Sequence, residues 1–237
     1  MMSELIYLSI CKQFLFGINN QQQRLLKEYV ESLLEWNTKI NLISRKDTEN
    51  VWTQQILAST SFLFTFELEP YSSVIDIGTG GGLPGIPIAI LRPDLRFVLI
   101  DSIRKKINAV QNIINSLGLK NVSFFCGRAE DLSNKQELQN NFDYVIARAV
   151  SATKDIIQWG KPFIKTGKQY DAKACNSNKK QLIPRGSIIL LKGGDISAEI
   201  EEAKIKHRPQ NIQIFPIVID GNDSIQLFDK KIVIIKP

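Results

Sequence analysis

The stretch from Val74 to Gly85 (VIDIGTGGGLPG) restricts the possible folds of this chain more than any other part of it. Its apolar beginning reads as a buried strand, and Gly78, Gly80 and Gly82 follow directly. Glycines there allow a sharp turn and let a ligand approach the backbone, where side chains would block it. Asp76 precedes the first glycine by two residues, so its carboxylate can hold the loop or, through water, the amino-acid part of a cofactor. The pattern predicts a cofactor loop after the first strand of an α/β domain.

Apolar segments and helical patterns alternate along the chain after Pro70. Repeated strand–helix units of this kind build a doubly wound, mostly parallel sheet. Seven strands are expected, at residues 73–77, 96–101, 121–126, 143–147, 187–192, 211–218 and 231–236. The last two, with turn residues Gly221 to Ser224 between them, predict an antiparallel closing pair. The expected fold class is therefore α/β and Rossmann-like, with an antiparallel final strand.

The first 69 residues read as helices throughout. Apolar positions recur at helical spacing from Gln22 to Trp36, and a second helical run extends from Val51 to Phe66. We expect residues 1–69 to form a helical extension packed on one domain of residues 70–237. Within that domain, residues 166–186 are polar, turn-rich and basic, which predicts a mobile surface insertion whose charges are solvated or, alternatively, contact RNA.

The glycine loop is compatible with two cofactors, S-adenosylmethionine and a dinucleotide. Residues Gly80 to Gly85 also match GxGxxG, the fingerprint that places a pyrophosphate at a helix N-terminus. However, the loop opens earlier, at Gly78, and Pro84 and Pro87 remove backbone donors that a diphosphate needs. Asp101, at the end of the second strand, can bind the ribose hydroxyls of either cofactor. The position of the first glycine, directly after the strand, favours S-adenosylmethionine over a dinucleotide.

Two later strand ends add candidate residues at the same edge of the sheet. Ala129 and Glu130 follow the third strand, where a polar turn can border an adenine ring. Arg148 ends the fourth strand, an unusual place for a guanidinium unless it faces a pocket or an anion.

Composition indicates which binding partners and which cellular compartment to expect. Thirty Lys and Arg against 24 Asp and Glu give a net charge of +6, which favours a polyanionic partner without proving one. Cys11, Cys126 and Cys175 lack CxxC spacing, so neither a metal site nor a disulfide framework is expected and a reducing cytoplasm fits best. No apolar run approaches transmembrane length, and no membrane partner is expected.

The ordered motifs resemble one family, the bacterial small-subunit ribosomal RNA guanine-N7 methyltransferases, also called glucose-inhibited division protein B. The resemblance covers most of the chain. Its carriers are Trp36 to Ser44 (WNTKINLIS), Asp76 to Pro87 (DIGTGGGLPGIP), Arg92-Pro93, Asp101-Ser102 with Lys105-Lys106, and Arg148-Ala149. The resemblance implies a class I methyltransferase that moves the methyl group of S-adenosylmethionine to N7 of a guanine in the 530 loop of 16S ribosomal RNA. The implied partner is that RNA or the 30S subunit, and a monomer is expected.

The resemblance also implies a set of site residues. Those expected at the cofactor are Gly78, Leu83, Ala129, Glu130 and Arg148, which join Asp76, Gly80, Gly82 and Asp101 from the arguments above. Arg148 is in addition the candidate catalytic residue. Candidates for RNA contact are Asn41, Lys105, Lys106, Arg128 and Lys192, four of them cations suited to phosphates.

The chain departs from the family in two places. Where members usually read His-Ile-Leu-Asp-Ser, this chain has Gln55 to Ser59 (QILAS), so the shared His and Asp are replaced by Gln55 and Ala58. Gln55 can still form hydrogen bonds. The insertion at residues 166–186 is also longer than the family usually carries.

The implied chemistry needs no general base. Guanine N7 has a free lone pair and no proton at neutral pH, so catalysis reduces to positioning and desolvation. Four alternatives remain open: methylation of another RNA, methylation of a small molecule, a nicotinamide dehydrogenase, and an RNA-binding module with reduced activity.

Overall fold

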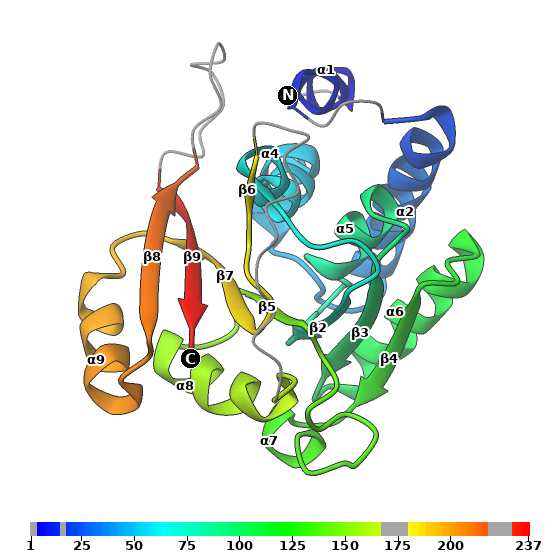
Figure 1. Cartoon of the computed structure of the whole chain (residues 1–237). Coiled ribbons are helices and arrows are strands. Elements are labelled where there is room, and N and C mark those ends of the chain that lie inside the picture. The colour runs from blue at the N-terminus through cyan, green and yellow to red at the C-terminus, as the bar shows by residue number, and fades with distance from the viewer. Residues whose placement is uncertain (1–3, 15–17, 167–179, 218–228) are drawn as a thin grey trace.

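A seven-stranded sheet forms the centre of the molecule (Figure 1). The computed structural model describes residues 4–14, 18–166, 180–217 and 229–237. The strand order is β4-β3-β2-β5-β7-β9-β8. The strands are β2 (Ser73–Ile77), β3 (Arg96–Asp101), β4 (Val122–Cys126), β5 (Tyr144–Arg148), β7 (Ser187–Gly193), β8 (Asn211–Pro216) and β9 (Lys230–Lys236). The predicted doubly wound sheet is confirmed.

The direction of the strands also follows the prediction. β2, β3, β4, β5 and β7 are parallel, whereas β9 is antiparallel to both β7 and β8. β2 lies in the middle of these five parallel strands, and all five of its residues are buried, as expected of a strand that is covered on both faces. The turn predicted at Gly221 to Ser224 lies outside the described residues.

Helices cover both faces of the sheet (Figure 1). Side chains alternate along each strand, so Val74 packs into one apolar cluster and its neighbour Ile75 into the other. The helices of the domain are α5 (Gly85–Leu91), α6 (Arg104–Leu117), α7 (Ala129–Leu132), α8 (Thr153–Gly160), the 3-10 turn η3 (Lys161–Phe163) and α9 (Ser197–His207). Across the described residues, no helix combines the length and apolarity that a membrane span requires.

The N-terminal helices pack on the face that carries α5 and α6. They are α1 (Glu4–Phe14), α2 (Asn20–Lys39), the 3-10 turn η1 (Arg45–Asp47), the π-helix η2 (Trp52–Leu57), α3 (Ala58–Thr60) and α4 (Phe62–Thr65). A capping box between Asn19 and Gln22 starts α2. The Gln22 amide also donates to the carbonyls of Ile90 and Leu91, both at 3.1 Å, and thereby ties α2 to the end of α5.

One small sheet was not predicted. β1 (Phe66–Glu67) pairs in parallel with β6 (Gln181–Leu182), so the first 69 residues are not helical throughout and the end of the expected insertion is a strand. Nearby, Lys180 Nζ donates to the Leu63 carbonyl at 2.7 Å, and Arg185 forms an ion pair with Glu69 at 2.7 Å. These two cations are therefore bound within the fold. Residues 167–179 of the insertion lie outside the described residues.

Candidate cofactor cleft and adjoining pocket

A cleft of about 400 Å³ opens at the carboxyl ends of β2, β3, β4 and β5. Its volume falls in the range of small-molecule sites, and its position is the one that doubly wound sheets use for ligands. Of the predicted cofactor residues, Gly78, Asp101, Ala129 and Glu130 line it, and the candidate RNA residues Lys106 and Arg128 lie at its wall. The sheet therefore brings residues from three strand ends to one cleft.

Asp101 joins the glycine loop to the end of β3. Its Oδ2 accepts from the Gly80 N–H at 3.0 Å, and its Oδ1 accepts from the Ile103 N–H at 2.9 Å. The residue is 7% exposed and faces the cleft. Asp101 thus fixes the loop while leaving lone pairs toward the position of the predicted ribose.

Gly78 lines the cleft directly after the end of β2. Its φ is +70°, and its N–H donates to the Ile100 carbonyl at 2.9 Å. A Cβ at this position would lie 2.6 Å from the side chain of Val150, which also lines the cleft. Both the backbone conformation and the available space therefore require glycine at this turn.

Asp76 acts on the loop rather than on the cleft. The side chain is fully buried, and Oδ2 accepts from the Thr79 hydroxyl at 2.7 Å and from the Gly85 N–H at 3.0 Å. Burial raises the pKa of this carboxyl to about 7, although both hydrogen bonds and the nearby Arg148 lower it. Of the two roles expected from the sequence, the structure supports holding the loop.

Three other predicted cofactor residues do not line the cleft. At Gly82 an added Cβ would lie 2.3 Å from the side chain of Ile86, so packing inside the loop excludes a side chain there. Gly80 contributes its N–H to Asp101. Leu83 is 5% exposed and packs in the core. At Gly82 the space without a side chain is thus occupied by the protein itself, whereas a Cβ at Gly80 would meet only the Leu42 carbonyl, at 3.9 Å. The expectation that the loop glycines keep space for the cofactor stays a prediction at Gly80.

The helical extension supports the back of the loop, which the sequence did not indicate. The Tyr29 hydroxyl of α2 donates to the Gly81 carbonyl at 3.0 Å. A Cβ at Gly81 would lie 2.6 Å from Leu33 of the same helix. Tyr29 and Leu33 lie on the apolar face of the predicted helix, but the spacing of apolar residues does not show which part of the protein that face packs against.

The candidate RNA residues separate into two groups. Asn41, Lys105 and Arg128 are exposed, and Lys106 is half-buried at the cleft. Lys192, in contrast, is turned inward: its side chain is 11% exposed and pairs with Glu199 at 3.1 Å. We therefore do not place Lys192 among the cations that reach RNA.

Arg148 lies beside the cleft, in a second pocket of about 220 Å³. One guanidinium nitrogen donates to the carbonyls of Gln54 at 3.1 Å and Gln55 at 3.4 Å, and another donates to the Gln55 side-chain oxygen. The Gln55 amide in turn donates to Asp47 Oδ2 at 2.9 Å. Residues of the extension and of the core thus form one hydrogen-bonded wall. Sequence reasoning missed Asp47, since no local pattern links it to the end of β5.

Ala149 connects the two cavities because it lines both of them. Its φ of +52° is uncommon for a residue that carries a side chain, and such a conformation persists only where its surroundings impose it. The turn directs Arg148 into the second pocket and Val150 into the cleft. A molecule in one cavity is therefore adjacent to a molecule in the other.

Comparison with known proteins identifies the family. The family model described as "GidB: rRNA small subunit methyltransferase G" matches residues 22–180. The chain belongs to this family. It is 43% identical to the ribosomal RNA small subunit methyltransferase G of Flavobacterium johnsoniae over 70% of this chain and 71% of that protein. Against the protein of the same name from Bacteroides fragilis, identity is 37% over 82% of this chain and 86% of the relative.

Solved structures agree on the fold. TYW2 of M. jannaschii in complex with AdoMet is 16% identical, with a TM-score of 0.53 over 84% of this chain and 78% of that one. This family member thus has the class I methyltransferase fold, and its family is S-adenosylmethionine-dependent. The cleft fits that cofactor, because Asp101 offers acceptors for hydroxyls, Glu130 offers a carboxylate at the rim, and Gly78 and Ala129 keep the wall free of bulk.

Proposed function

We propose that this protein transfers the methyl group of S-adenosylmethionine to N7 of a guanine in the 530 loop of 16S ribosomal RNA. The observation that carries the proposal is the pair of cavities that share Ala149 at the carboxyl edge of the sheet, in a member of this family. One cavity holds the methyl donor and the other the base. We further propose that the protein acts in the cytoplasm and as a monomer.

The chemistry places few demands on the protein. S-adenosylmethionine supplies a methyl group on a positively charged sulfur, which a nitrogen lone pair can displace. Guanine N7 already has such a lone pair, so no side chain has to remove a proton before the attack. The residues of the two cavities hold N7 in line with the methyl group and exclude water, which accounts for most of the rate in reactions of this kind.

Each group of residues has a proposed part. Gly78, Asp101, Ala129 and Glu130 bind the cofactor, and Asp76 keeps the loop in place. Arg148 shapes the base pocket. Asn41, Lys105, Lys106 and Arg128 bind the RNA backbone around the target, since cations and small polar groups at the rim suit phosphates.

Methylation of ribosomal particles tests the proposed function directly. We would incubate the protein and tritiated S-adenosylmethionine with 30S subunits from cells that lack it, and then map N7-methylguanosine in the 16S RNA. The expected result is one label in the 530 loop. Label in another nucleotide or in a metabolite fraction would contradict the proposal. S-adenosylhomocysteine should also raise the melting temperature, which a nicotinamide enzyme would not show.

A further inference from the structure

We propose that Asp47 reads the target base, and that its carboxylate accepts hydrogen bonds from N1–H and N2–H of guanine in the pocket beside Arg148. This inference rests on the proposed function and assigns the substrate-specifying residue of that site. It depends on where Asp47 lies, what holds it, and which edge of the base must face it.

The pocket has the size and the walls of a base site. Its volume is about 220 Å³, and apolar side chains of Ala58, Leu191 and Ile217, all less than a tenth exposed, form part of its surface. Flat aromatic bases extruded from RNA are held by contacts of this kind together with hydrogen bonds to their edges. Asp47 comes from the extension and Ala149 from the core, and they are connected through the Arg148 guanidinium and the Gln55 amide.

A neutral amide holds the carboxylate of Asp47, and among the described residues no cation forms a direct ion pair with it; the Arg148 guanidinium, on the far side of that amide, interacts with it electrostatically. Asp47 Oδ2 accepts from the neutral amide of Gln55 at 2.9 Å, and among the described residues no hydrogen bond engages Oδ1. The lysines of the pocket have other partners: Lys192 pairs with Glu199 at 3.1 Å, and Lys230 with Asp229 at 3.5 Å. Asp47 is therefore a fixed acceptor with free lone pairs.

Asp47 is also the only carboxylate among the described residues that line the pocket. Ala58 belongs to the apolar wall and offers no acceptor. Gln55, which replaces the usual His, bridges Asp47 and Arg148 through both ends of its amide. In this chain, the recognition of donor groups on a base thus falls to Asp47.

The reaction fixes the orientation of the base. N7 must face the cofactor cleft, which the pocket meets at Ala149. The N1 and N2 donors then point away from the cleft, since they lie on the opposite edge of the purine. Guanine is the only RNA base that presents two adjacent donors there. Adenine would direct the lone pair of its N1 at the Asp47 carboxylate, and that contact is repulsive.

A substitution that keeps the shape and removes the acceptor tests this assignment. In Asp47→Asn the amide oxygen can still accept from Gln55, while an amide NH₂ meets the donors of guanine. Single-turnover methylation is measured on 30S subunits rebuilt with guanine or with inosine, which lacks the N2 amino group, at the target position. For the wild type we expect inosine to react roughly 10- to 100-fold more slowly, the value of one charge-assisted hydrogen bond.

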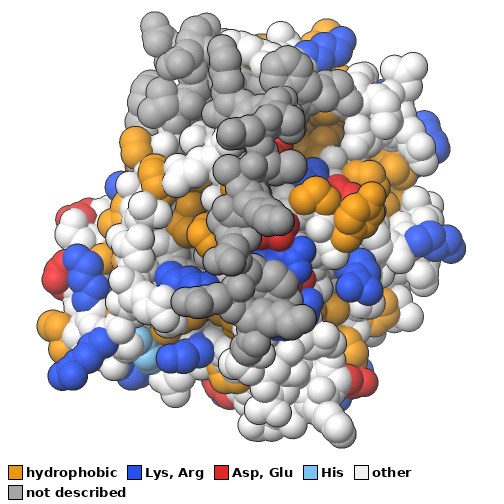
Figure 2. All heavy atoms as spheres, in the orientation of Figure 1, with side chains coloured by type: hydrophobic (Ala, Val, Ile, Leu, Met, Phe, Trp, Pro, Cys, Tyr) orange, Lys and Arg blue, Asp and Glu red, His pale blue; other side chains and the backbone are white. Residues whose placement is uncertain are grey.

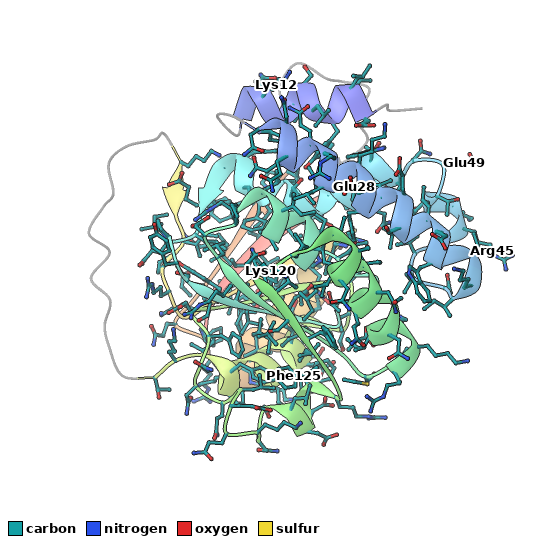
Figure 3. The ribbon with its side chains drawn as sticks, turned by 90° about the vertical axis from the view of Figure 1, so that its right-hand side faces the viewer. Lys12, Glu28, Arg45, Glu49, Lys120 and Phe125 are labelled. Atoms are coloured by element: carbon teal, nitrogen blue, oxygen red, sulfur yellow. The ribbon has the colours of Figure 1, made fainter. Side chains whose placement is uncertain are left out.

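The variant should lose the preference itself. Asp47→Asn should methylate guanine roughly 10- to 100-fold more slowly than the wild type, with inosine no slower than guanine. Its melting temperature and its affinity for S-adenosylhomocysteine should match those of the wild type, which separates base reading from a structural effect. Glu49→Gln is the matched control, because Glu49 is an exposed carboxylate on the outer side of the extension (Figure 3). It should behave as the wild type.

Two outcomes overturn different claims. If the wild type methylates the 530 loop and Asp47→Asn does so at the same rate, or still prefers guanine over inosine to the same degree, Asp47 does not read the base. If the wild type leaves 16S RNA unmethylated, the proposed function fails, and this inference fails with it.

Discussion

At the scale of single residues, Asp76 is the clearest conflict between charge and burial. It is fully buried, its Oδ2 has two hydrogen bonds, and its Oδ1 has no partner among the described residues. Charged Asp101 lies close enough to raise the pKa of Asp76 further, and Arg148 opposes this shift. The loop is therefore held by a carboxyl group that releases its proton only near neutral pH.

The raised pKa of Asp76 gives the protein a pH-dependent stability. Unfolding returns the pKa from about 7 to 3.8, so between these values the folded protein binds the proton more tightly than the unfolded chain. The stabilisation is complete below pH 3.8 and is lost as the pH rises toward 7. From pH 5 to pH 7.5 the free energy of unfolding should fall by about 2.5 kcal/mol from this group. Urea unfolding at the two pH values measures it.

Asp76→Asn should flatten that profile, because an amide oxygen can accept from Thr79 and Gly85 without titrating. Asp195→Asn is the control. Asp195 is exposed, and its hydrogen bonds from Ser197 lower its pKa, so its own contribution changes only under more acidic conditions. Equal slopes in the wild type and Asp76→Asn would show that another group causes the pH dependence.

At the scale of elements, the π-helix η2 joins the extension to the core. π-helical turns are rare and often lie at functional sites. Here the carbonyls of Gln54 and Gln55 accept from Arg148 at the end of β5. Burial lowers the pKa of this guanidinium, while Tyr29, Asp76 and Asp47 raise it. One side chain thus holds a helix of the extension at the wall of the second pocket.

Arg148→Ala should strongly reduce methylation while leaving the fold intact. The loss of the anchor allows η2 to shift, and displacements of about 1 Å at a reacting centre cost on the order of 100-fold in rate. Affinity for S-adenosylhomocysteine should change little, because Arg148 does not line the cofactor cleft. Methylation of 30S subunits, circular dichroism and calorimetric binding check the three parts.

Arg96→Ala is the matched control for Arg148→Ala. Arg96 is exposed at the start of β3, the opposite edge of the sheet, and this variant should keep wild-type turnover. Undiminished turnover in Arg148→Ala would remove Arg148 from the site.

At the scale of the whole molecule, net charge does not by itself locate the RNA surface. On the face shown in Figure 2, Lys and Arg side chains are scattered among acidic, polar and apolar ones. Two of the candidate phosphate ligands, Lys106 and Arg128, line the cleft, and Lys105 lies next to Lys106 in the first turn of α6. The position of cations relative to the two cavities matters more than the total of +6.

Lys105→Ala should lower the salt dependence of RNA binding. Each phosphate contact contributes about 0.7 to the slope of log affinity against log salt for single-stranded RNA. The variant should therefore show a slope smaller by about 0.7, measured by fluorescence anisotropy with a 530-loop RNA. Lys120→Ala provides the comparison. Lys120 is exposed at the other end of β4, as Figure 3 shows, and the slope should stay unchanged. Equal slopes for both variants would contradict this RNA surface.

Local patterns in the sequence determined most of the architecture. Strands are alternating or continuous apolar runs, helices have a 3.6-residue period, and both properties are set by neighbouring residues. The order of these elements, with glycines after the first strand and Asp101 after the second, specified the sheet, the cleft and the class of cofactor. The pair β1 and β6 escaped prediction because two-residue strands leave no measurable period.

The tertiary structure alone decided which residues share a site and which way each one faces. Gly80 and Gly82 lie in the glycine loop with Gly78, yet only Gly78 lines the cleft. The Lys192 side chain forms an ion pair with Glu199 and does not line the cofactor cleft. The Gln55 amide forms hydrogen bonds with both Asp47 and Arg148 and thereby links them. Contacts between distant segments depend on how helices pack on the sheet, and neither hydrophobic period nor motif spacing records that packing. The sequence therefore located the cofactor loop, and the packing of the extension on the core created the second pocket beside the cleft.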